Sequence, residues 1–65
     1  MKTTYEYLIA KATYALASKS RDLVYETYGM AKMASALCAI SDEQFLELNE
    51  MLVKKGLNNP KAGLE

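Results

Sequence analysis

Helix breakers are almost absent from the first 55 residues of this chain, which contain Gly29 but no proline. Ala, Leu, Met, Glu and Lys dominate that stretch, and these residue types favour helix. Gly56, Pro60 and Gly63 are gathered near the end. The distribution predicts an all-α fold that stops shortly after residue 55. A chain of 65 residues forms at most one domain, and its own core is small.

Two helix starts are marked by capping boxes. In the first, Thr3 precedes Glu6 by three residues; in the second, Ser41 precedes Gln44 by the same spacing. In this motif the hydroxyl accepts from the backbone N–H three residues on, and the longer side chain reaches back to the cap. One helix is therefore expected to begin near Thr4 and another to cover 42–55.

The flanks of the 42–55 helix carry further signals. Ile40 and Phe45 occupy the two positions of a hydrophobic staple. Lys54 and Lys55 lie in the last turn, where the helix dipole favours cations. Gly56 follows them, and we expect it to adopt the left-handed conformation that commonly ends a helix.

The segment from residue 4 to residue 39 allows two interpretations. Its apolar positions keep one helical phase from residue 5 to residue 37, and this favours one long helix over 4–39. Such a helix would leave most of its apolar seam bare in a monomer, and so it implies a dimer. A break near 18–20, with Ser20 capping a second helix, is the alternative and gives a three-helix bundle. The seam consists of Tyr5, Leu8, Ile9, Ala12, Ala15, Leu16, Leu23, Met30, Met33, Ala34 and Leu37, with Lys19, Glu26 and Thr27 as polar interruptions.

Composition argues against several kinds of chemistry. The chain has no histidine and a single cysteine, Cys38. A Cys–His nucleophile pair, a disulfide framework and a multi-cysteine zinc site are thereby excluded. Cys38 lies among apolar residues and is expected to be a small buried hydrophobe. We therefore expect no catalytic residues, no metal site and no cofactor.

Carboxylates and methionines fit structural roles. The acidic residues of the 42–55 helix are expected on its solvated face, and the methionines as core filling. The acidic residues are Asp42, Glu43, Glu47 and Glu50, and the methionines are Met30, Met33 and Met51.

A second stripe lies opposite the apolar seam and holds four of the five tyrosines. Tyrosine and arginine are frequent in interface hot spots, and an aromatic, basic surface also suits single-stranded nucleic acid. Amphipathic tyrosines partly covered by a neighbouring helix are the structural alternative. The candidate partner-binding face is Tyr7, Lys11, Tyr14, Arg21, Tyr25, Tyr28 and Lys32.

Residues 34–48 loosely match the spacing of a DNA-binding helix-turn-helix. The would-be recognition helix, however, carries Asp42, Glu43, Glu47 and Glu50, whose charges oppose phosphate. The sequence therefore argues against duplex DNA as the partner.

The stretch Leu37-Cys38-Ala39-Ile40-Ser41-Asp42-Glu43-Gln44-Phe45, followed by Leu48 and Leu52, resembles the hairpin of short C-terminal oligomerisation (SHOCT) domains. Ser41 and Gln44 stand where that pattern has Thr and Glu, and its turn glycine is missing here. The wider chain is similar to small uncharacterised proteins of Gram-positive phages and mobile elements. That similarity implies no established activity, and the hairpin implies a role in assembly.

Together these features predict one helical domain over 1–57 and a flexible tail over 58–65, of which residues 64–65 look vector-derived. We expect a non-enzymatic protein-interaction or oligomerisation module, a small regulator or adaptor that forms a homodimer and binds an unknown protein. A nucleic-acid-binding accessory protein is the alternative. No apolar run reaches the length of about 18 residues that a membrane span requires, and no signal peptide is evident, so a cytoplasmic location is expected.

Overall fold

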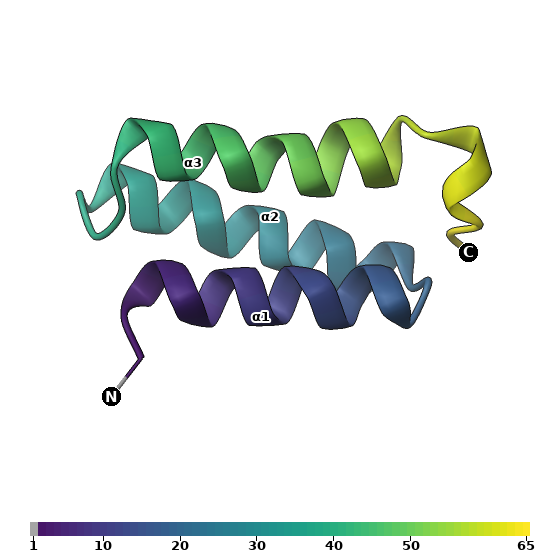
Figure 1. Ribbon diagram of the computed structural model, residues 1–65, viewed down its shortest axis with the longest axis horizontal. Coiled ribbons are helices and arrows are strands. Elements are labelled where there is room, and N and C mark those ends of the chain that lie inside the picture. The colour runs from purple at the N-terminus through teal and green to yellow at the C-terminus, as the bar shows by residue number, and fades with distance from the viewer. Residues whose placement is uncertain (1) are drawn as a thin grey trace.

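Three antiparallel helical rods make up the protein in a computed structural model that describes residues 2–65. The first two rods are joined by a tight turn, and the third runs alongside them (Figure 1). The elements are α1 (Thr4–Ala17), α2 (Arg21–Ala36), α3 (Asp42–Asn49), the π-helix η1 (Glu50–Leu57) and the short 3-10 helix η2 (Pro60–Ala62). The third rod consists of α3 and η1 together. The expected all-α class is confirmed.

The single long helix over 4–39 is wrong, because the chain reverses direction between α1 and α2. Lys19 adopts a left-handed φ of 54°. Its N–H donates to the Leu16 carbonyl at 3.1 Å, and the Ser20 N–H reaches the Ala15 carbonyl at 3.5 Å. This pair of bonds is the Schellman arrangement that closes a helix. The alternative break near 18–20 is therefore the correct one, and folding back covers apolar surface that one long helix would leave bare.

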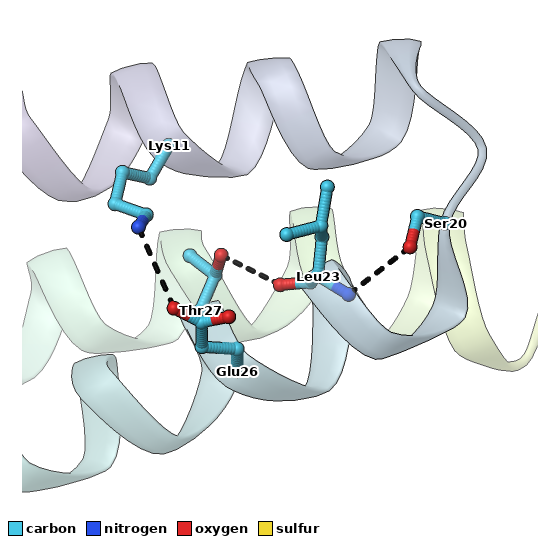
Figure 2. A network of polar contacts seen from close by, with 5 residues as sticks. All are labelled: Lys11, Ser20, Leu23, Glu26 and Thr27. Carbon is cyan, nitrogen blue, oxygen red and sulfur yellow. Dashed lines mark hydrogen bonds and ion pairs between the residues drawn. The ribbon is translucent and has the colours of Figure 1, made fainter.

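Ser20 ends the turn and begins the next helix. Its side chain accepts from the Leu23 backbone N–H at 3.3 Å, as Figure 2 shows. A cap of this kind satisfies one of the free N–H groups at a helix start. The whole reversal thus needs only three residues, because one residue serves both helices.

Cys38 forms the second reversal by the same device. Its φ is 59°, its N–H donates to the Ser35 carbonyl at 3.0 Å, and the Ala39 N–H donates to the Ala34 carbonyl at 2.8 Å. The expectation of a buried cysteine is wrong: the thiol is exposed. The left-handed position after a helix lies at the surface, so the turn and not the apolar neighbourhood decides its exposure.

Both predicted capping boxes are confirmed. The Glu6 N–H donates to the Thr3 hydroxyl at 3.1 Å, and the Gln44 N–H donates to the Ser41 hydroxyl at the same distance. The return bonds to the cap N–H groups are also present. Ile40, which directly precedes the second cap, is buried in the core cluster, and the half-buried Phe45 packs against that cluster.

The core lies where the three rods meet. Its buried apolar side chains are Leu8, Ala12, Ala15, Val24, Ala31, Ala34, Ile40, Leu48 and Leu52. On α1 this matches the predicted seam, but on α2 the buried face is rotated from it. Thr27, expected as a polar interruption, is only 1% exposed, whereas Met33, expected in the core, is 61% exposed. Met30 and Met51 do pack against the core.

The Thr27 hydroxyl is accommodated within its own helix. It donates to the Leu23 carbonyl at 2.8 Å, one turn back (Figure 2). A buried hydroxyl paired in this way avoids the cost of an unmade hydrogen bond.

The third rod runs further than predicted. α3 passes into η1 without a break, and η1 includes Gly56 and ends at Leu57. The left-handed assignment of Gly56 is wrong, since only Gly63 among the glycines has a positive φ. Gly56 is buried instead, close to Leu16 and Val24.

Residues 58–65, expected as a flexible tail, return to the turn between α1 and α2 (Figure 1). The Arg21 N–H donates to the Glu65 carbonyl at 3.0 Å, and the Glu65 N–H donates to the Lys19 carbonyl at 3.1 Å. Leu64 packs against the core. In the structure the segment is thus packed against the bundle; the vector origin of 64–65 stays a prediction.

Candidate functional site: an apolar groove between the first two helices

The predicted tyrosine and lysine face is divided by the turn at 18–20. On α1, the Lys11 ammonium lies 5.9 Å from the centre of the Tyr7 ring. The same ammonium lies 3.7 Å from the Glu26 carboxylate of α2 (Figure 2). Lys11 therefore bridges the first two helices, and its charge is partly matched.

On α2, one member of that face, Tyr28, packs against the third rod. The Tyr28 ring stacks on Phe45 of α3 at a centroid distance of 6.5 Å, and the Lys32 ammonium lies 5.6 Å from the Tyr28 ring centre. Tyr28 is half-buried by this packing. For this residue the structural alternative, a tyrosine covered by a neighbouring helix, is the one observed.

The remaining members of the face are exposed: Tyr14, Arg21 and Tyr25. The structure brings Tyr7 together with Lys11, and Tyr28 together with Lys32. It does not gather all seven residues on one surface. The face was predicted from one continuous helical periodicity, and this periodicity no longer places residues on a common side once the chain reverses between α1 and α2.

A different surface feature lies between the N-terminal half of α1 and the C-terminal half of α2. It is an open groove of about 600 Å³, and its lining is almost wholly apolar. The lining residues are Thr4, Tyr7, Leu8, Glu26, Gly29, Met30, Met33, Ala34, Leu37 and Ala39.

The groove carries two large apolar side chains that the core does not use. Met33 is 61% exposed and Leu37 is 71% exposed. With Met30 they follow the i, i+3, i+7 spacing that aligns side chains along one side of a helix. Sequence reasoning singled out these residues, but assigned them to the interior seam.

Gly29 forms part of the same groove. A β-carbon built on it would have nothing within 4 Å, so the folded chain does not require a glycine there. Glycine inside a helix costs about 1 kcal/mol relative to alanine. The monomer therefore bears this cost without any packing reason of its own.

The electrostatics of the groove are mild. Glu26 is its only charged lining residue, and Lys11 lies beside that carboxylate. An apolar occupant would therefore displace water from the groove without burying an unmatched charge.

A second, smaller hollow of about 290 Å³ lies between α1 and the third rod, and is lined by Tyr5, Ile9, Glu47, Glu50, Met51 and Lys55. The Tyr5 hydroxyl donates to the Glu47 carboxylate. That hydrogen bond is the main reason that the pKa of Tyr5 is raised above its ordinary value of 10.0, with desolvation and the Glu47 charge adding to it.

Acidic side chains do not converge on a metal site: within residues 2–65, no cluster of three or more potential metal ligands among His, Cys, Asp and Glu is found. Asp42, Glu43, Glu47 and Glu50 are exposed, as expected of a solvated face. In the same part of the chain, no helix combines the length and apolar character needed to cross a bilayer.

The chain was also compared with known proteins. No family model, curated protein or solved structure matches it. The groove is therefore interpreted from its own geometry.

Proposed function

We propose that this protein is a non-enzymatic interaction module that binds a protein surface through the groove between α1 and α2. The observation that supports this most is the exposure of Met33 and Leu37 beside a hollow of about 600 Å³. Apolar side chains grouped around a concave surface mark interaction sites more often than apolar residues scattered singly.

The sequence resemblances agree with such a role. The SHOCT-like hairpin implies assembly, and a small regulator or adaptor of a mobile element acts by binding. Both remain part of the proposal, as does the absence of enzymatic activity.

Photocrosslinking tests the proposal. A benzoylphenylalanine residue placed at position 33, inside living source cells, should give crosslinked protein on illumination. The matched control places it at position 46, because Leu46 is 63% exposed but lies on α3, outside the groove. Crosslinks at position 33 and not at 46 are expected. Equal yields at both positions, or none at 33, would overturn the proposal.

Nucleic acid binding remains the second candidate, because Tyr14 and Tyr25 expose aromatic rings and Arg21 and Lys32 add positive charge. Titration with single-stranded and duplex oligonucleotides at two salt concentrations distinguishes it. Micromolar binding that weakens steeply with salt would favour this candidate, because phosphate contacts release counterions.

A further inference from the structure

We infer that the occupant of the groove is a second copy of this chain, docked with its α2 antiparallel to the first. This inference rests on the proposed function and names the partner.

The shape of the groove restricts what can fill it. Met33 stands exposed in its lining, so an occupant must offer a hollow that receives it. It must also offer a side chain large enough to fill the space above Gly29. A helix face that lacks either the hollow or the large side chain does not fit the groove.

α2 itself meets both needs. Gly29 and Met33 are four residues apart, a spacing that places them next to each other on one side of a helix. Suppose that two copies of α2 pack antiparallel, with Met33 of the first copy over Gly29 of the second. The two-fold axis then also places Met33 of the second copy over Gly29 of the first. A two-fold interface requires this kind of self-complementary patch, in which a projection and its hollow belong to the same surface.

This arrangement also explains why residue 29 is a glycine. Its missing side chain serves no contact within the monomer, because a β-carbon there meets open space. In the dimer the missing side chain admits the methionine of the partner copy and lets the two helix backbones approach closely.

The charges permit the arrangement. Glu26 is the one charged residue of the lining and has Lys11 at 3.7 Å in the same copy. Two copies therefore bring together matched charges, and no carboxylate is buried alone.

The size of the groove indicates how tightly two copies should bind each other. Ten residues line it, whereas a standard interface uses about 20–30 residues on each side. We therefore expect a weak dimer, with a Kd on the order of 10–100 μM.

Sedimentation equilibrium tests the inference on the full chain, at concentrations from about 5 to 500 μM, which bracket that Kd. A monomer–dimer equilibrium is expected. Met33→Asp should raise the dissociation constant at least about tenfold, because it places a charge in an apolar contact. Leu46→Asp is the matched control and should leave it unchanged, since Leu46 is equally exposed but lies on α3.

Gly29→Leu separates the interface from the fold. The position is open in the monomer and leucine favours helix, so the thermal midpoint at low concentration should rise. The filled hollow should at the same time weaken the dimer. A residue with a purely structural role would not change the two quantities in opposite directions.

Three outcomes would overturn the inference. They are a wild-type monomer throughout the concentration range, a dimer that Met33→Asp and Gly29→Leu leave intact, or a dimer broken by Leu46→Asp. A monomer that still forms position-33 crosslinks to a different protein would overturn the second copy as occupant and leave the proposed function standing.

Discussion

Gly56 of η1 lies so close to α1 that a β-carbon placed on it would come within 3.0 Å of the Leu16 Cδ2 methyl. The same atom would be 3.4 Å from the Met51 carbonyl oxygen. The glycine therefore permits the close approach between the first and third rods and does not serve an unusual backbone angle.

This relationship predicts a steep dependence on side-chain size at position 56. Gly56→Ala gains about 1 kcal/mol of helix propensity but must displace the Leu16 methyl, so its net effect should be small. Gly56→Val should destabilise by about 1–3 kcal/mol, as overpacking does. Urea unfolding measures both.

Two companion variants check the cause. Leu16→Ala should show a coupling of at least about 0.5 kcal/mol with Gly56→Val, because the two side chains compete for one space. Gly29→Ala, where the space is open, should stabilise the protein at low concentration. If Gly56→Val were as stable as wild type, the close contact with Leu16 would be refuted.

The two left-handed turn residues predict stabilising substitutions. Lys19 and Cys38 have φ values of 54° and 59°, a region in which a side chain costs roughly 1–2 kcal/mol. Cys38→Gly should therefore raise the free energy of unfolding by about 0.5–1 kcal/mol, after allowance for the added freedom of the unfolded chain. Lys19→Gly should act in the same direction.

The matched control for these variants is Ala10→Gly, which puts glycine at an exposed right-handed position within α1. It should cost about 1 kcal/mol. Loss of stability in Cys38→Gly of the same size would show that the turn does not hold the left-handed conformation. Thermal unfolding by circular dichroism suffices for all three proteins.

The partial burial of Phe45 predicts a moderate loss of stability when its side chain is truncated. It is half-buried and stacks on Tyr28, so Phe45→Ala should cost about 2 kcal/mol, below the 3–5 kcal/mol typical of a fully buried phenylalanine. The neighbouring Leu46 is 63% exposed, and Leu46→Ala should change stability by no more than about 0.5 kcal/mol. Chemical denaturation of the two variants side by side decides the matter: equal losses would place Phe45 outside the core.

The Tyr5–Glu47 contact predicts a change in stability at alkaline pH. The hydrogen bond to Glu47 raises the pKa of Tyr5 above 10.0 in the folded state, so the folded protein holds this proton more tightly than the unfolded chain. The resulting stabilisation is complete below about pH 10 and is lost as the pH rises through the raised pKa.

Wild type and Tyr5→Phe therefore should differ by a constant amount below about pH 10 and converge above it. Glu47→Gln removes the carboxylate and should flatten the same alkaline dependence. Unfolding midpoints measured from pH 8 to about pH 11.5 test this. A wild-type alkaline loss that persists unchanged in both variants would show that the contact does not act on stability.

Local features of this chain could be predicted from the sequence. The capping boxes at Thr3 and Ser41 connect residues only three positions apart, so their geometry follows from the helix start itself. The all-α class followed in the same way from propensity and from the late position of the breakers. The cap at Ser20 was also recognisable, although the unbroken apolar phase favoured passing over it.

The tertiary structure decided what helical spacing leaves open. A helical wheel records rotation about one axis, and once the chain reverses at Lys19 each side of α2 meets a new neighbour. Thr27 was then buried and Met33 left exposed, because contacts with α1 and the third rod select the buried side of α2. The closeness of Gly56 to Leu16 has the same origin: it joins residues 40 positions apart, and only the packing of whole helices brings them together.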